Sequence, residues 1–216
     1  MSTVSSRAVS APPTVHVVDD DDATARAMAR LLETAGFLVK TYPSANNFLQ
    51  AFAPGHPGCI ILDVRMPGVS GLELQTAIAG RDDKLPIIFL TGHAEVPDSV
   101  RAIQRGAIDF LTKPVDAPVL LDAVSRALTR DAADRQQREH YRERRALYDR
   151  LTAREREVFA HLISGQLNKQ VAADLHISER TIKLHRASIF QKLEVDSIAG
   201  LTRFAVDLGI DPARRQ

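Results

Sequence analysis

The chain has 216 residues, of which 44% are hydrophobic and 25% are charged, and its formal net charge is +1. These values are ordinary for a globular protein, so they exclude an intrinsically disordered chain and a collagen-like one. No apolar run approaches the roughly 20 residues that cross a bilayer, and the single cysteine, Cys59, cannot form an internal disulfide. We therefore expect one or two domains in a cytoplasmic protein without a membrane partner.

Residues 1–13 consist mainly of Ser, Ala and Pro and lack the apolar block of a secretory signal, which predicts a disordered lead-in. From residue 14 to residue 130, short apolar segments alternate with segments of helical periodicity. This pattern is typical of an α/β domain whose parallel sheet is wound on both faces by helices. The predicted strands are Thr14–Val18, Phe37–Thr41, Cys59–Leu62, Pro86–Thr91 and Ala107–Leu111.

Helices are predicted after each of these five strands. Glycine can adopt the left-handed conformation that ends many helices, and proline is favoured in the first turn of a helix. The expected boundaries are Gly36 as the end of the first helix, Ser44 as the start of the second, Gly71–Ala79 as the third, Pro97 and Gly106 as the two ends of the fourth, and Asp116 near the start of the fifth.

A helical linker and a second, all-helical domain are expected after residue 130. Oppositely charged residues four apart fill residues 131–150, which favours a solvated linker helix. Thr152 and Glu155 then form the capping-box pattern that starts a helix. The domain is predicted to span residues 151–210, with further helices at Asn168–Leu175, Glu179–Leu193 and Ser197–Leu208.

The two halves of the chain differ mildly in charge. Residues 1–130 hold 12 basic and 14 acidic residues, a net −2, and residues 131–216 hold 16 and 13, a net +3. Within the second half, Ser178–Leu193 alone carries four basic residues against one acid. A basic helix that follows a shorter helix and a three-residue turn is the helix-turn-helix pattern, whose second helix enters the DNA major groove. A merely solvated basic face is the alternative on charge alone.

Charged and hydroxyl residues follow the strands of the first domain. Ligand sites of doubly wound sheets lie beyond the carboxyl ends of the strands. The residues predicted there are the acidic run Asp19–Asp22, then Asp63, Thr91 and the pair Lys113-Pro114. Clustered carboxylates suit Mg²⁺, and a carboxylate can accept a phosphoryl group while the metal and Lys113 neutralise its charge. Asp63 is therefore a candidate nucleophile, although alone it could be an ordinary loop acid. Asp21 and Asp22 could equally be acids that complement a helix dipole.

These residues resemble the receiver domain of two-component response regulators. The resemblance rests on Val17-Val18-Asp19-Asp20, the run from Asp63 to Gly71, Thr91-Gly92-His93 and Lys113-Pro114, in this order over residues 14–130. It implies a flavodoxin-like five-stranded fold, with Asp63 as the phosphoacceptor and a cis peptide before Pro114. It also implies Mg²⁺ held by Asp20, Asp63 and the backbone carbonyl of Arg65, with Asp19 completing the acidic pair through water. Thr91 and Phe110 would form the switch pair, and Lys113 would contact the phosphoryl group.

The second domain resembles the LuxR-type DNA-binding domain, and the whole chain is similar to response regulators of the FixJ/NarL family. The quoted segments are Leu151 to Val158, Gly165, Asn168-Lys169, and Thr181 to Arg186. The resemblance implies that base contacts come from Lys183, Leu184 and Ala187, whereas Lys169, Arg186 and Lys192 contact phosphates. Thr181 and His185 complete the implied DNA-binding residues, with His185 as either a phosphate contact or a packing residue. Ala187 cannot donate a hydrogen bond, but it can touch a thymine methyl group.

The function expected from these resemblances is that of a phosphorylation-controlled transcriptional regulator rather than an enzyme. Its partners would be a sensor histidine kinase, double-stranded promoter DNA and, once phosphorylated, a second copy of the chain bound through the fourth helix and fifth strand. One alternative is a receiver protein that works through protein contacts without binding DNA. Another is an aspartyl-phosphate phosphohydrolase, against which the position of Asp63 after the third strand argues. His16 and Cys59 lie in predicted strands and are expected to be core residues.

Overall fold

The computed structural model describes residues 11–80, 84–92 and 96–211, which form two compact units. The first unit ends at Asp134 and the second begins at Arg135. Most of the predicted lead-in falls on residues 1–10, and His93 of the sequence motif falls on residues 93–95. Both lie outside the described residues. None of the helices in the described ranges combines the length and the apolar character that crossing a membrane requires.

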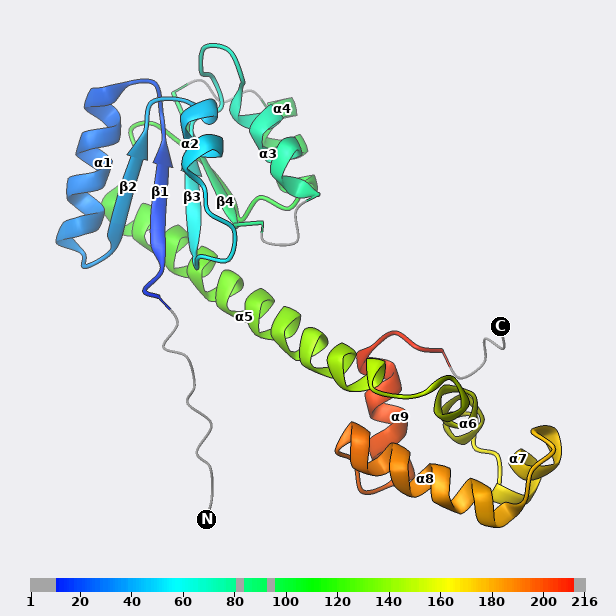
Figure 1. The fold of residues 1–216 in the computed structure, drawn as a ribbon. Coiled ribbons are helices and arrows are strands. Elements are labelled where there is room, and N and C mark those ends of the chain that lie inside the picture. The colour runs from blue at the N-terminus through cyan, green and yellow to red at the C-terminus, as the bar shows by residue number, and fades with distance from the viewer. Residues whose placement is uncertain (1–10, 81–83, 93–95, 212–216) are drawn as a thin grey trace, which may run out of the picture. The chain divides into compact units, whose positions relative to one another are not determined.

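The first unit contains a five-stranded parallel sheet, as predicted (Figure 1). Its strands are β1 (Thr14–Val18), β2 (Leu38–Tyr42), β3 (Gly58–Leu62), β4 (Ile87–Thr91) and β5 (Asp109–Thr112), and their order across the sheet is β2-β1-β3-β4-β5. All four pairings are parallel. The carboxyl ends of the strands therefore lie at one edge of the sheet.

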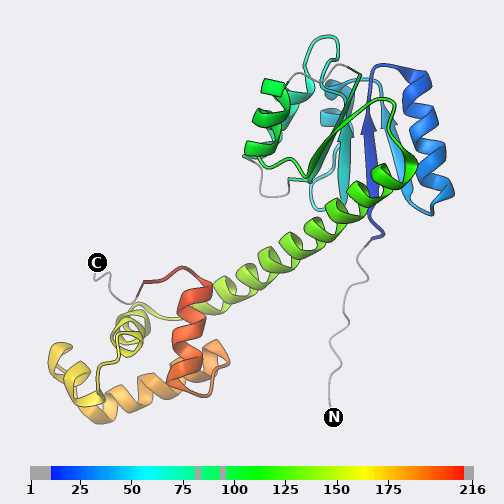
Figure 2. The same cartoon turned by 180° about the vertical axis from the view of Figure 1, so that it is seen from behind.

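Helices cover both faces of this sheet. The helices α2 (Ala45–Ala51), α3 (Gly71–Ala79) and α4 (Val96–Gln104) pack on one face around Phe48, Leu74 and Phe89. The other face is covered by α1 (Asp22–Thr34) and by the first part of α5 (Ala117–Asp149). Figure 2 shows the start of α5 in front of the strands. Every residue of β3 and β4 is buried, because the sheet lies between two apolar layers.

Some boundaries differ from the sequence prediction by one or two residues. The fifth strand begins at Asp109 instead of Ala107, because Gly106 adopts a left-handed conformation and the Ala107 N–H closes the end of α4 on the Ala102 carbonyl. The fourth helix begins at Val96, so Pro97 is its second residue instead of its first. Such shifts reflect hydrogen bonds that a local pattern does not specify.

The fifth helix and the predicted linker helix are one continuous helix of 33 residues, α5. Its only proline, Pro118, lies in the first turn, where proline is tolerated, and neither proline nor glycine follows it within the helix. Its first part packs on the sheet through apolar residues, and the last of its buried residues is Asp131, whose carboxylate accepts the Gly58 N–H at 2.9 Å. The division between the two units falls inside this helix, three residues later.

The second unit is all helical. After the end of α5 come α6 (Ala153–Ile163), α7 (Asn168–Asp174), α8 (Glu179–Leu193) and α9 (Ile198–Asp207). Their core includes Phe159, Ile182 and Phe204, and the Tyr148 ring of α5 lies 5.4 Å from the Phe159 ring. The predicted capping box at Thr152 is present, since its side chain accepts the Glu155 N–H.

Candidate functional site

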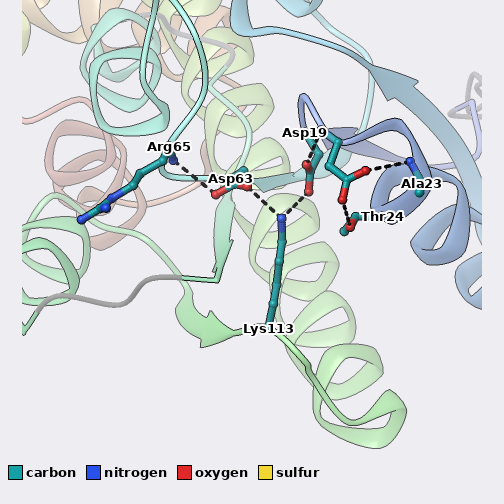
Figure 3. A network of polar contacts seen from close by, with 7 residues as sticks. Asp19, Ala23, Thr24, Asp63, Arg65 and Lys113 are labelled. Atoms are coloured by element: carbon teal, nitrogen blue, oxygen red, sulfur yellow. Dashed lines mark hydrogen bonds and ion pairs between the residues drawn. The ribbon is translucent and has the colours of Figure 1, made fainter.

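The carboxyl edge of the sheet brings two carboxylates and one ammonium together (Figure 3). Lys113, which follows β5, places its Nζ 2.6 Å from an oxygen of Asp19 and 2.8 Å from an oxygen of Asp63. Asp19 follows β1 and is buried, whereas the side chains of Asp63 and Lys113 are partly open to solvent. The sequence prediction that these strand ends converge is confirmed.

Backbone contacts fix the two carboxylates in place. The Asp63 N–H donates to the Val18 carbonyl at 2.9 Å, which continues the pairing of β3 with β1. The remaining oxygen of Asp63 accepts the Arg65 N–H at 3.2 Å, as Figure 3 shows. Gly71 begins α3 directly against this strand end, because a Cβ atom at Gly71 would lie 2.2 Å from the Asp63 carbonyl oxygen.

Burial and ion pairing act against each other at this edge. Burial raises the pKa of Asp19 above its usual value, although the hydrogen bond from Lys113 opposes the shift. Burial also lowers the pKa of Lys113, but its hydrogen bonds to Asp19 and Asp63 outweigh that effect, and its pKa is raised. The ammonium therefore stays charged and holds the two acids close together.

The acids fit a hard divalent cation. Each of Asp19, Asp20 and Asp63 offers a carboxylate oxygen, and these three oxygens lie within 4.8 Å of one another. Among the described residues, no other group of at least three His, Cys, Asp or Glu side chains has this geometry. Asp20 is exposed, which leaves one side of the group open to water and to a ligand. A site with only a few carboxylate ligands and with coordination positions left open suits Mg²⁺, because this ion retains several of its waters.

The other two acids of the run lie at the amino-terminal end of α1, where acids complement the helix dipole, as their alternative interpretation predicted. The Asp21 side chain accepts the Ala23 N–H at 3.0 Å and the Thr24 hydroxyl at 2.7 Å. Asp22 lies in the first turn of the helix and pairs with Arg26 one turn later. Neither is part of the three-carboxylate group.

The remaining predicted residues of this unit lie on β4 and β5. Thr91 ends β4 and is buried, and its carbonyl accepts the Lys113 N–H at 2.8 Å. Phe110 is partly buried beside Phe89, with 5.8 Å between the ring centroids. The peptide between Lys113 and Pro114 is cis, as the resemblance implied. A backbone hydrogen bond therefore links Lys113 directly to the strand that carries Thr91.

A second candidate site is the solvent-facing side of α8. Ser178 caps this helix through the Thr181 N–H, and three apolar side chains, Ile182, Ile189 and Leu193, are fully buried as predicted. Lys183, Leu184 and Ala187 are exposed. Leu184 has 66% of its surface accessible, which leaves its side chain open to contact with a ligand.

The flanks of α8 hold the other predicted contact residues. Lys169 is exposed on α7, and Arg186 reaches Asn168 of α7 at 3.4 Å while its guanidinium lies 5.2 Å from the Phe190 ring centre. Thr181 and His185 are half-buried. These positions leave Lys169 accessible and hold Arg186 against the protein.

Lys192 pairs with a buried carboxylate of another helix, which the sequence did not indicate. Its Nζ lies 2.6 Å and 2.8 Å from the two oxygens of Glu155, a buried residue of α6. Our expectation that Lys192 contacts phosphate overlooked this pair, because residues 37 positions apart share no local pattern. The capping box identified Glu155 in the sequence, but only as the cap of its own helix.

Models of two known families match the chain. Residues 15–125 match the response regulator receiver domain, and residues 149–205 match the luxR family of bacterial regulatory proteins. The two matches cover the sheet unit and the helical unit respectively. Each candidate site described above lies inside one of them.

Similar proteins span nearly the whole chain. The transcriptional regulatory protein FixJ of Azorhizobium caulinodans is 42% identical over 92% of this chain and 94% of its own length. The response regulator protein TmoT of Ectopseudomonas mendocina is 41% identical over 88% of this chain and 86% of its own. Among solved structures, the response regulator StyR is 44% identical with a TM-score of 0.81, covering 91% of this chain and 99% of its own. Full-length FixJ from B. japonicum is 34% identical with a TM-score of 0.55, and the match covers 92% of this chain and 98% of its own.

Proposed function

Because the chain belongs to the FixJ/NarL family of response regulators, DNA-binding transcriptional regulators with a receiver and a LuxR-type domain, we propose that phosphorylation of Asp63 controls its binding to promoter DNA. The observation that carries the proposal is the position of Asp63 between the Lys113 ammonium and the acidic pair. The donor would be the phosphohistidine of a sensor histidine kinase. The activity would take place in the cytoplasm, where bacterial DNA is.

In the phosphotransfer step, an oxygen of Asp63 attacks phosphorus, the bond from phosphorus to the histidine nitrogen breaks, and an aspartyl phosphate forms. Lys113 is close enough to Asp63 to pair with a phosphoryl oxygen, because its ammonium already lies 2.8 Å from the carboxylate. The Arg65 N–H holds the Asp63 side chain in its orientation. We propose no chemistry beyond gain and loss of this phosphoryl group.

Asp20, Asp63 and the Arg65 carbonyl would hold a Mg²⁺ ion, with Asp19 acting through water. The closely spaced carboxylate oxygens and the exposed side of Asp20 support this assignment. When bound, the ion would neutralise charge on the phosphoryl oxygens. Asp19 itself keeps Lys113 in place through their 2.6 Å ion pair.

Phosphorylation would change the molecule through Thr91 and Phe110 and favour a dimer through α4 and β5. A ligand shifts a conformational equilibrium only by binding one state better, and the Thr91 hydroxyl at the end of β4 can make such a differential contact. The dimer would present two copies of α8 to two half-sites, as symmetric helix-turn-helix proteins do. Lys183, Leu184 and Ala187 would read bases, while Lys169 would bind phosphate, with Thr181, His185 and Arg186 at the edge of the contact.

The phosphoacceptor is tested by incubating the full chain with a small phosphodonor, with and without Mg²⁺, and mapping the adduct by mass spectrometry. We expect one phosphoryl group on Asp63 that requires Mg²⁺ and is absent in Asp63→Asn. Asp22→Asn serves as the matched control, since Asp22 is a nearby acid that pairs with Arg26 instead of Lys113. Full labelling of Asp63→Asn, or labelling that is independent of Mg²⁺, would contradict the proposal.

A further inference from the structure

The recognition helix α8 is held by polar contacts on both sides of its buried stripe. On one side, Ser188 donates its hydroxyl to Glu155 at 2.6 Å, and Lys192 donates to both Glu155 oxygens. On the other side, Arg186 contacts Asn168 of α7. Successive residues of a helix are rotated by about 100°, so Ser188 and Lys192, four apart, share one side of α8.

Glu155 has an unusually complete set of partners for a buried carboxylate. Only 4% of its surface is exposed, yet its two oxygens accept the Thr152 N–H, the Ser188 hydroxyl and the Lys192 ammonium, all within 2.8 Å. Burial alone would raise the pKa of Glu155, but these hydrogen bonds lower it to about 2. The charged carboxylate thus links the start of α6 to the last two turns of α8 through hydrogen bonds.

Apolar packing and the hydrogen bonds of Glu155 constrain different aspects of the orientation of α8. Contacts among apolar side chains are non-directional, so the buried stripe of α8 fixes which side faces the core but permits small rotations about the helix axis. Hydrogen bonds weaken steeply when their geometry changes. A carboxylate that binds Ser188 and Lys192 together therefore fixes both the rotation and the axial position of α8.

From this arrangement we infer that Glu155 is a positioning residue for DNA reading, which acts through Ser188 and Lys192 to set the orientation of the exposed face of α8. The inference rests on the proposed DNA-binding function and assigns a sequence-selecting role to residues that touch no base. Leu184 lies one turn before Ser188 and Ala187 is adjacent to it, so a rotation of α8 moves both away from their base edges. Phosphate contacts tolerate such movement better, because long basic side chains can follow the backbone.

Two duplexes test the inference with the full chain. The first is selected by the wild-type chain from a random-sequence pool, and the second is its scrambled version. We expect Glu155→Gln and Lys192→Met to lose between about 5-fold and about 100-fold in affinity for the selected duplex, the cost of base contacts that no longer fit. Their affinity for the scrambled duplex and the dependence on salt should stay unchanged. Lys192→Arg should restore most of the selectivity, because it keeps a charged donor.

Three controls separate positioning from other roles. Phe204→Leu removes core packing from α9 in the same unit. Partial unfolding weakens binding to both duplexes equally, so this variant should leave the ratio of the two affinities, for the selected and the scrambled duplex, unchanged. Lys169→Met should weaken both duplexes and lower the salt slope by about one unit, as loss of a phosphate contact does. Ser188→Ala keeps the ion pair between Lys192 and the buried Glu155, so it remains informative if Glu155→Gln unfolds, and it should show a smaller loss of selectivity.

The possible failures are distinguishable. If Glu155→Gln and Ser188→Ala both discriminate the two duplexes as well as the wild type, the positioning role is wrong. If Lys192→Met lowers the salt slope by about one unit, Lys192 contacts phosphate directly and the inference is also wrong. A wild-type chain that selects no sequence from the pool would instead contradict the proposed function.

Discussion

The buried histidine His16 lies in the core of the receiver unit, where its protonation is coupled to folding. Its ring lies in β1 beneath Tyr42, whose hydroxyl is 3.0 Å from Nδ1, and the Phe48 ring packs edge-on at 5.5 Å. Burial, followed by the charges of Lys40 and His56, lowers the pKa of His16 from 6.5 to about 4. As predicted from its place in a strand, it is a core residue.

We expect this histidine to destabilise the receiver unit in mild acid. The unfolded chain binds a proton near pH 6.5 and the folded chain only near pH 4, so the free energy of unfolding decreases as the pH falls through this window. The loss amounts to at most about 3 kcal/mol. Chemical denaturation of the wild type and of His16→Gln at several pH values measures it, because glutamine can still bond Tyr42 but does not titrate. Identical pH dependence in the two chains would show that His16 does not cause the loss.

At the scale of residues, the sequence predicted side chains that follow a strand or repeat along a helix. Asp19, Asp63 and Lys113 could be placed together because parallel strands end at one edge, and Ile182 and Ile189 because their spacing puts them on one side of a helix. The ion pair that Lys192 forms could not be predicted. Its partner Glu155 comes from another helix, and only tertiary packing shows that this ammonium neutralises a buried carboxylate.

Elements meet most closely where α3 begins at the end of β3. Gly71 stands at this point because a side chain there would overlap the backbone of Asp63. The Gly71 N–H also donates to the Val64 carbonyl at 3.0 Å, which ties the helix start to the loop that carries the acid. The position of Asp63 thus depends on a helix that contributes none of the proposed functional side chains.

Gly71→Ala should therefore disturb both stability and phosphorylation. The added methyl group would have to displace backbone, so we expect a loss of about 1 to 3 kcal/mol in the free energy of unfolding and slower labelling of Asp63. Gly80→Ala is the matched control, because Gly80 ends the same helix with a φ of −84° and nothing within 4 Å of the added atom. Thermal unfolding and the labelling rate measure the two effects. Labelling of Gly71→Ala at the wild-type rate would show that α3 does not position Asp63.

At the scale of elements, helix and strand types were predictable along the described chain, whereas some of their ends were not. The third helix, Gly71–Ala79, and the eighth, Glu179–Leu193, match their predicted bounds because serine caps begin them. The fifth strand begins later than predicted because the end of α4 uses the Ala107 N–H first. The charged residues spaced four apart after residue 130 marked a change of surroundings, from buried to solvated, within one helix.

At the scale of the whole molecule, the two units have separate cores and share one helix. The first core lies on the two faces of the sheet, and the second includes the last turns of α5 together with α6 to α9. A phosphoryl group on the first unit can change DNA binding by the second without a direct contact between them, if it changes how many copies of α8 act together. A dimer that binds two half-sites gains affinity from both.

The surface of α4 is suited to such a dimer. Val100 and Ile103 each expose 47% of their surface on this helix, which packs next to β5 at one edge of the sheet. Exposed apolar side chains that lie together often mark contact surfaces. The opposite edge strand, β2, carries Leu38, which is 51% exposed and offers a comparison of similar size and accessibility.

We therefore expect the wild-type chain to change from monomer to dimer when Asp63 is phosphorylated, and Ile103→Glu to remain a monomer, because each partner would bury a carboxylate in the contact. Leu38→Glu should dimerise like the wild type. Thr91→Ala should take up the phosphoryl group but dimerise less, since it lacks the hydroxyl that we propose makes different contacts in the two states. Sedimentation velocity on chains with equal phosphoryl content, verified by mass spectrometry, measures all four. Full dimerisation of Ile103→Glu would place the interface elsewhere, and full dimerisation of Thr91→Ala would remove Thr91 from the switch.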